Sequence, residues 1–383
     1  MLTMRQKQAV TKELKLKYKR GTKKKKSLVL DDFCGLTGYN RVYASRILRS
    51  EYISRKNNAI STNKRNVVYD ESVLTSLTKI WVIADGICGK RLAPFLPELL
   101  DKLIKFNEIK VSKKVYGKLS RISASTIDRL LKNTKKKMAL KGRSTTKPGT
   151  LLKHSIPIRT FSDWDESKAG FFEVDCVANC GSSIAGEYIN TLNLTDIKTA
   201  WMEFEAVLGK AEARVFAAIK NRRGSCPIPF LGIDSDGGSE FINSELVRYC
   251  NHERLTFTRS RPYRKNDQNF VEQKNYSVIR RVLGYARFET HAQLNLVNRI
   301  LSLYRFYVNF FQPVDRLREK IRNGPRTTRQ YDKALTPYQR ILLCPEISQN
   351  IKNDLCSIYA KLNPADLKRR IDSLRHELYR SVK

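Results

Sequence analysis

The order of strand-like and helix-like segments between residues 161 and 317 constrains the fold of this chain most. Three runs rich in aromatic and β-branched residues come first: FFEVDCV, YINTLNLTDI and WMEFEAVLG. A helix is then predicted over AEARVFAAIKNRR, a strand over FLGIDSD, a helix over SELVRYCNHER and a short strand over LTFTR. Two long helical segments follow. This β-β-β-α-β-α-β-α-α order predicts one mixed α/β domain of ordinary size.

Residues 1–60 combine positive charge with a helix-turn-helix pattern. The basic run that ends in four consecutive lysines is interpreted as a solvated charge run. After it, Leu30 and Phe33 predict a helix with an apolar face, GLTG predicts a tight turn, and a second helix is expected over Asn40–Arg49. Any pair of packed helices would match this pattern as well. The second helix carries the candidate DNA-binding residues Arg41, Arg46 and Arg49.

Residues 61–137 form a second region that the sequence predicts to be helical. Its helices are expected to be interrupted by Pro94 and Pro97. A second helix-turn-helix-like pattern follows, in which Ser125 is the expected N-cap of a basic helix. Two units of this kind would suit a protein that reads a long DNA end.

The sequence therefore predicts a multidomain chain. A helical N-terminal part precedes an α/β domain with a mixed central sheet, and a linker rich in Lys, Thr, Ser and Pro joins the two. A basic, irregular linker is expected to lead from this domain into a mainly helical C-terminal region. The expected boundaries are residues 1–60, 61–137, 138–160, 161–317 and 318–383.

The charge of the chain predicts a polyanionic partner. The formal net charge is +36, from 73 Lys and Arg against 37 Asp and Glu. Residues 1–150 contain 36 of these basic residues and 11 of the acidic ones, so the N-terminal part is the more basic. An excess of this size is typical of nucleic-acid binding, and double-stranded DNA is the expected partner.

Neither a transmembrane segment nor a signal peptide is predicted. The chain contains no apolar run near 18 residues, and its first residues lack the apolar region of a secretory signal. A cytoplasmic, nucleoid-associated bacterial protein is expected. Its eight cysteines are therefore expected to be reduced thiols, and their spacing does not match a structural zinc site.

Three acidic residues stand out by their positions in the predicted elements. Asp175 lies near the end of an apolar strand, Asp236 directly follows another strand, and Glu272 lies early in a helix. Carboxylates at such positions favour a cation, and paired Mg²⁺ ions require oxygen ligands from several chain segments. The residue pattern alone does not separate them from the nearby acids Asp234, Glu240 and Asp267.

The stretch from Asp175 to Asn275 resembles the catalytic core of retroviral integrases and of the bacterial insertion-sequence transposases that share it. The matching runs are DGGSEF, RPY and VEQKN, and segments such as IPIRTFSDWDE and YDKALTPYQR resemble the transposase branch. In that family the aspartate before Asn-Gly or Gly-Gly is a metal ligand, as is the glutamate three residues before an asparagine. The resemblance thus favours Asp236 and Glu272. Gly237 stands where the family commonly has Asn, a change that the same turn tolerates.

This resemblance implies a ribonuclease H-like fold and a DNA transposase. The implied reaction hydrolyses the 3′ ends of a mobile element and joins the freed ends to target DNA at two Mg²⁺ ions, for which Mn²⁺ may substitute. It also implies a homo-oligomer, at least a dimer on DNA. Asn275 would position DNA or water, and five basic residues are expected to contact phosphates: Arg259, Arg261, Arg264, Lys265 and Lys274. Trp201, Phe270 and Tyr276 are expected to be core aromatics.

Two other functions compete with this hypothesis. One is a catalytically silent DNA-binding protein of transposon origin, which the presence of all three carboxylates disfavours. The other is a ribonuclease H-like DNA nuclease, which would have little use for a helix-turn-helix region.

Overall fold

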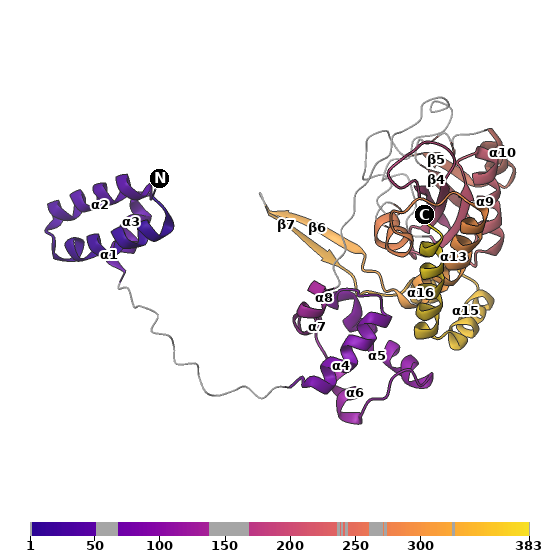
Figure 1. Ribbon diagram of the computed structural model, residues 1–383, viewed down its shortest axis with the longest axis horizontal. Coiled ribbons are helices and arrows are strands. Elements are labelled where there is room, and N and C mark those ends of the chain that lie inside the picture. Colours follow the sequence, from indigo (N-terminus) through magenta and orange to yellow (C-terminus); the bar gives the residue numbers. More distant parts are fainter. Residues whose placement is uncertain are drawn as a thin grey trace. The chain divides into compact units, whose positions relative to one another are not determined.

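The chain divides into two compact units, Met1–Val68 and Tyr69–Lys383 (Figure 1). The computed structural model describes residues 2–50, 68–137, 168–235, 238, 240–241, 244–259, 271, 274–323 and 326–382. Three helices make up the described part of the first unit. The second unit contains a helical part, a five-stranded sheet with its helices, a two-stranded hairpin and three C-terminal helices.

The first unit packs α1 (Met4–Arg20), α2 (Lys23–Thr37) and α3 (Arg41–Arg49) around a small core. That core consists of Tyr18, Leu30, Phe33, Ala44 and Leu48. The basic N-terminal run, interpreted as a solvated charge run, lies in α1 and the start of α2, where Lys23, Lys24 and Lys25 are exposed. The turn predicted over GLTG is also shorter than four residues. Helix α2 continues through Thr37 and ends at Gly38, whose positive φ of 68° suits glycine.

The helical part of the second unit comprises α4 (Glu71–Ile83), α5 (Gly89–Lys105), α6 (Lys113–Leu119), α7 (Ala124–Leu130) and α8 (Lys132–Lys137). The expected break at Pro94 and Pro97 is wrong, since both prolines lie inside the continuous helix α5. Six large apolar side chains of α5 are buried, and this packing offsets the backbone hydrogen bonds that proline cannot make.

Helices α6 and α7 lie where the second helix-turn-helix-like pattern was predicted, and the N-cap of α7 differs from the one expected. Ser123, rather than Ser125, caps α7, and its hydroxyl accepts a hydrogen bond from the Thr126 N–H. Helix α7 packs closely against the start of α5. A Cβ atom added to Gly89 would lie 2.2 Å from the Ala124 carbonyl oxygen, so glycine is required at this crossing.

The central sheet consists of β1 (Phe171–Ala178), β2 (Ile189–Asp196), β3 (Met202–Leu208), β4 (Gly232–Ser235) and β5 (Thr256–Arg259). Its strand order is β3-β2-β1-β4-β5, with β2 antiparallel to both neighbours and β4 parallel to β1 and β5. Helix α9 (Glu212–Ser225) follows β3, and α10 (Ser244–His252) follows β4. The predicted mixed sheet and the order of its elements are confirmed.

Helix α13 (His291–Phe311) covers the open edge of this sheet at β3. The Asn309 side chain accepts a hydrogen bond from the Met202 N–H at 2.9 Å and donates one to the Met202 carbonyl at 2.8 Å. Asn298, three turns earlier, makes the same pair of bonds with Ala206. Two amide side chains thus satisfy backbone groups that an edge strand would otherwise leave unpaired.

The remaining elements follow or flank α13. A π-helix, η1 (Asn275–Arg280), leads into the short helix α12 (Arg281–Leu283). The C-terminal helices are α14 (Pro337–Leu343), α15 (Gln349–Lys361) and α16 (Pro364–Arg380).

The prediction of an irregular linker over residues 318–336 is wrong for most of that range. Strands β6 (Leu317–Asn323) and β7 (Arg326–Tyr331) pair there as an antiparallel hairpin. All eight cysteines are free. Within the described ranges, no helix has both the length and the apolar character needed to span a membrane.

Candidate active site

One face of the central sheet carries polar residues along its middle strands. Alternate residues of a strand share a face, so Glu173 and Asp175 of β1 lie on the same side of the sheet. The strand register places Asn193 of β2 opposite Asp175, and Asp234 of β4 opposite Glu173. Glu173, Asn193 and Asp234 have no exposed surface, whereas Asp175 is half-buried. Asp175 is therefore the most accessible polar residue of this set.

Asp175 is oriented by a chain of side-chain hydrogen bonds that crosses from β1 to η1 and β2. The Asn275 amide donates to Asp175 Oδ2. The Asn193 amide donates in turn to Asn275 Oδ1 at 2.9 Å, and the Thr195 hydroxyl donates to Asn193 Oδ1 at 3.3 Å. The other Asp175 oxygen accepts the Cys176 N–H at 2.7 Å. These contacts fix both the position and the rotamer of the Asp175 carboxylate.

A second contact holds the segment that leads to η1 against the same strand. Glu173 Oε2 accepts a hydrogen bond from the Val271 N–H at 2.9 Å. Val271 and Asn275 lie on either side of Glu272 in the sequence, and both are bonded to side chains of β1. Neither Glu173 nor Asn193 was predicted to have a role; a polar residue inside an apolar strand is the signal that would have found them.

The described residues contain one of the three predicted carboxylates. Asp236 and Glu272 lie outside the described residues, as does Asp267. Among the residues that the structure describes, no cluster of three or more His, Cys, Asp or Glu side chains could hold a metal ion. The two other rival acids have partners of their own: Asp234 accepts the Thr258 hydroxyl at 2.6 Å, and Glu240 pairs with Lys210 at 2.7 Å.

In the first unit, the three predicted arginines of α3 line one surface hollow. Its lining residues are Leu30, Arg41, Val42, Ser45, Arg46, Arg49 and Ser50. Arg41 pairs with Asp31, and Arg46 lies over the Tyr43 ring at 5.3 Å. Arg49 hydrogen-bonds the Tyr18 hydroxyl and holds the pKa of that hydroxyl below its ordinary value. Val42 is 80% exposed on this surface.

The other predicted DNA contacts have different surroundings. Arg259 is only 5% exposed at the end of β5. Lys274 lines a cavity of about 270 Å³ between the α4–α5 loop, η1 and α13. Burial, with the nearby cations Arg91 and Arg340, lowers the pKa of Lys274 to about 7. Three further predicted contacts lie outside the described residues: Arg261, Arg264 and Lys265.

Two aromatic residues expected in the core differ in exposure. Trp201 is 2% exposed, and its indole N–H donates to Glu203 Oε1 at 2.8 Å. Tyr276, which follows Asn275 on η1, is 69% exposed, so its assignment to the core was wrong. Phe270 lies outside the described residues.

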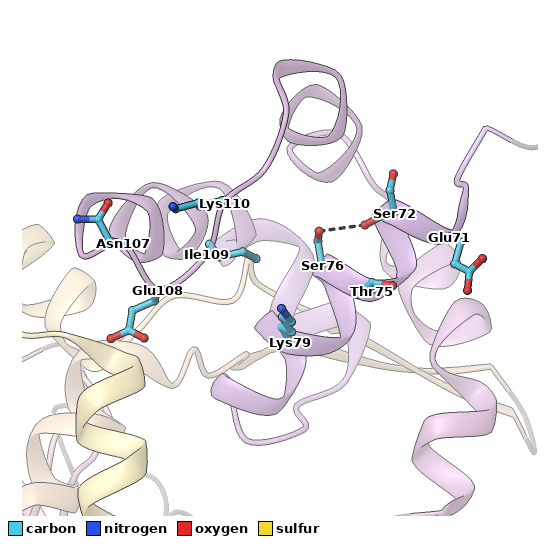
Figure 2. A pocket seen from close by; sticks show the side chains of 9 residues that line it. All are labelled: Glu71, Ser72, Thr75, Ser76, Lys79, Asn107, Glu108, Ile109 and Lys110. Atoms are coloured by element: carbon cyan, nitrogen blue, oxygen red, sulfur yellow. Dashed lines mark hydrogen bonds between the residues drawn. The ribbon is translucent and has the colours of Figure 1, made fainter.

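A further hollow lies in the helical part, between α4 and the α5–α6 connection (Figure 2). Its lining mixes hydroxyl, acidic and basic side chains, and the Ser76 hydroxyl there donates to the Ser72 carbonyl at 2.9 Å. Glu108 at its rim is bound by both Arg369 guanidinium N–H groups at 2.7 Å, an ion pair that lowers the pKa of Glu108 to about 2. None of the predicted site residues lies here.

No protein-family model matches this chain. Two solved structures to which it is similar are retroviral integrase catalytic cores. One is the core domain of BIV integrase, with a TM-score of 0.31 and 17% identity over 45% of this chain and 93% of that one. The other is the HTLV-2 integrase core in complex with magnesium, with a TM-score of 0.29 and 13% identity over 38% and 89% of the two chains. Both TM-scores lie below 0.5, so neither likeness by itself establishes a shared fold.

A curated bacterial protein aligns with most of the sequence. It is the Sinorhizobium fredii (strain NBRC 101917 / NGR234) protein named "Uncharacterized protein y4rM". The two sequences are 36% identical over 326 residues, which cover 85% of this chain and 91% of that protein. An identity of this size over most of both sequences shows that the chain belongs to the y4rM family.

Proposed function

We propose that this protein is a DNA transposase, a polynucleotidyl transferase whose catalytic carboxylates are Asp175, Asp236 and Glu272. The observation that carries the proposal is the network around Asp175. An oriented, half-buried carboxylate on β1 is bonded to Asn275, while Glu173 of the same strand binds Val271. The chain on both sides of Glu272 is thereby tied to the strand that carries Asp175.

The sheet topology supports the same proposal. The order β3-β2-β1-β4-β5, with β2 alone reversed, is consistent with the ribonuclease H-like fold that the family resemblance implies. In an open α/β sheet, sites form beyond the carboxyl ends of neighbouring parallel strands. Strand β4 pairs with β1 as far as Ser235, and Asp236 is the next residue in the sequence. We expect Asp236 to join Asp175 at this end of the sheet.

The Asp175 carboxylate itself suits a hard cation, because Mg²⁺ prefers oxygen ligands. The Asn275 amide and the Cys176 N–H donate to its two oxygens and hold it in place. Asp175, Asp236 and Glu272 would hold two Mg²⁺ ions, for which Mn²⁺ can substitute. Bound metal would stabilise the charge that develops during phosphoryl transfer. Asn275 would keep the Asp175 carboxylate in one orientation, so that little reorganisation is needed at that ligand.

DNA recognition is assigned in this proposal to the first unit. Helix α3 presents Arg46 and the exposed Val42 beside Arg41 on one surface. Arginine is suited to guanine edges and phosphates, and an apolar side chain is suited to thymine methyl groups. We leave Arg259 and Lys274 out of the proposed contacts because of their surroundings. Two DNA ends and one target favour at least a dimer on DNA.

Strand transfer in vitro tests this function. Wild-type protein would be incubated with Mg²⁺ and labelled duplexes taken from the DNA that flanks its gene. Glu272→Gln is the test variant, and Glu245→Gln, which changes an exposed glutamate of α10, is the matched control. We expect joined products with the wild type and the control, and none with Glu272→Gln.

The outcomes separate the competing functions. Binding of the ends without nicked or joined products, even from the wild type, would favour the catalytically silent DNA-binding protein. Nicked products that are never joined would favour the ribonuclease H-like nuclease. Equal activity of Glu272→Gln and wild type would remove Glu272 from the site.

A further inference from the structure

The hairpin formed by β6 and β7 is a second β structure that the proposed site does not use. Its residues 317–331, here called the basic arm, pair only with each other in the sheet topology. In Figure 1 the arm extends away from the central sheet of the same unit. An isolated two-stranded hairpin is only marginally stable in water, so an arm of this kind is expected to gain stability from a partner.

The base of the basic arm is firmly attached to the rest of the second unit. Val314, which precedes β6, and Leu335, which follows β7, exchange backbone hydrogen bonds of 2.9 and 3.2 Å. Asp315 pairs with Lys90 at 2.9 Å and with Arg91 at 3.1 Å. Burial acts to raise the pKa of Asp315, but these two cations outweigh it and hold the pKa below its ordinary value. The arm therefore projects from a fixed base.

A second acid at the base is also neutralised within the unit. Asp332 pairs with Arg340 at 2.8 Å and accepts the Arg316 N–H at 2.6 Å. Asp315 precedes the arm in the sequence and Asp332 directly follows it. Their charges are balanced by cations of the same unit and do not offset the charge of the arm itself.

The arm itself is strongly basic and exposed. Its 15 residues include five basic residues against one acid, Glu319, a net charge of +4. The basic residues are Arg318, Lys320, Arg322, Arg326 and Arg329. The side chains of Arg318, Arg322 and Arg329 are exposed, as are those of Thr327, Thr328 and Gln330, which offer hydrogen-bonding groups beside the charges.

The strand register brings basic residues of β6 and β7 to neighbouring positions of the arm. Lys320 lies directly opposite Arg329, and Arg322 lies two residues further along β6. Like charges directly opposite each other are unfavourable in a hairpin, and an anion bound beside this pair would relieve the repulsion. The arm therefore meets the requirements of a site for a polyanion.

We propose that the basic arm is a DNA-binding β-ribbon that contacts the phosphates and groove of double-stranded DNA. Strands of six or seven residues extend about 20 Å at roughly 3.3 Å per residue. The major groove of B-DNA is about 12 Å wide and admits a two-stranded ribbon. The proposal adds a DNA contact to the proposed transposase, but it needs only duplex binding and does not depend on catalysis by Glu272.

Duplex binding by the full-length protein tests the arm. The probe is a fluorescein-labelled duplex of mixed sequence, titrated at several salt concentrations and without divalent metal. The test variant is Arg318→Gln/Arg322→Gln/Arg329→Gln. Its matched control removes three exposed charges elsewhere in the unit, as Arg299→Gln/Lys361→Gln/Arg380→Gln. Equal thermal melting of all three proteins shows that the variants are folded.

We expect the arm variant to bind about 10- to 100-fold more weakly near 0.1 M salt, and its plot of log K against log salt to be less steep by about 2 to 3. The control variant should match the wild type. A reciprocal variant, Glu319→Gln, should bind about 2-fold more tightly, because it removes the only acid of the arm.

Unchanged affinity and salt dependence in the arm variant would overturn the proposal, and so would a wild type that binds no duplex. A shift in oligomeric state, measured by light scattering, with unchanged duplex binding would assign the arm to contact with a second copy instead. Loss of strand transfer in Glu272→Gln leaves these readings untouched, so the two proposals can fail separately.

Discussion

The two β structures of the second unit carry their polar residues in opposite ways. In the five-stranded sheet, Glu173 and Asn193 are buried and bonded to neighbouring groups. In the basic arm, Arg318 and Arg329 are exposed to solvent. The difference indicates two uses of polar residues. Buried groups of the sheet position other parts of the same chain, whereas exposed charges of the arm suit an external partner.

The covered edge of the sheet should show the largest effect on stability. Asn309→Leu removes the amide that satisfies both backbone groups of Met202, in a position with no exposed surface. Two unsatisfied backbone groups would lower the free energy of unfolding by about 2–5 kcal/mol. Thermal melting measures the loss. The control Asn353→Leu changes an exposed asparagine of α15 and should have little effect; a similar loss in both variants would contradict this role of Asn309.

The network around Asp175 should affect activity more than stability. Asn275→Ala removes the amide that orients the Asp175 carboxylate. Loss of such a positioning residue is expected to slow strand transfer by about 10- to 100-fold. Single-turnover rates and thermal melting, measured side by side, separate the two effects. A rate equal to that of the wild type would show that Asp175 does not need Asn275.

Reversing one charge of the basic arm should move two properties in opposite directions. Arg329→Glu places an acid opposite Lys320, which should stabilise the hairpin by about 0.2–1 kcal/mol. The same change should weaken duplex binding about 10-fold near 0.1 M salt. Hydrogen exchange of the strand amides measures the first effect, and the labelled duplex measures the second. A variant with a more stable arm that also binds DNA more tightly would contradict the proposed contact.

The smallest expected effect is a pH dependence at the start of β1. Glu346 accepts the Ala169 N–H at 2.9 Å and pairs with Lys198 at 2.5 Å. Burial opposes them, but these contacts lower the pKa of Glu346 to about 2 from an ordinary value of 4.5. The stabilisation is thus fully present above pH 4.5 and is lost as the pH falls toward 2. Between pH 4.5 and 2, the free energy of unfolding of Glu346→Gln should fall by about 1 kcal/mol less than that of the wild type. Identical acid unfolding of the two proteins would contradict this role of Glu346.

The order of strands and helices along the chain was predictable where hydrophobic periodicity was strong. The segments that form the sheet and α13 are long or strongly apolar, so their hydrophobic pattern was sufficient to predict them. The continuous helix α5 was not predictable, because tertiary packing of its apolar face overrides the effect of Pro94 and Pro97. The hairpin was missed because five of its 13 strand residues are Arg or Lys, so its strands lack an apolar pattern. The Asn323-Gly324 pair was the available turn signal.

The candidate site was predictable only in part. Asp175 followed from its strand and from the family resemblance, and the structure adds the residues that hold it. Asn193 and Glu173 act through contacts with segments about 80 to 100 positions away in the sequence. No local pattern reveals such partners, since they depend on how β1, β2 and η1 come together.

The rate of strand transfer by three single variants and their combination tests the central claim most directly. The variants are Asp175→Asn, Asp236→Asn and Glu272→Gln, compared with Glu245→Gln in Mg²⁺. Residues that act as one catalytic unit have non-additive effects. We predict that each single change reduces joining to a low residual rate and that the triple variant is no slower than the singles. Substantial joining by any single variant, or losses that add across the three, would contradict a single catalytic centre made of these carboxylates.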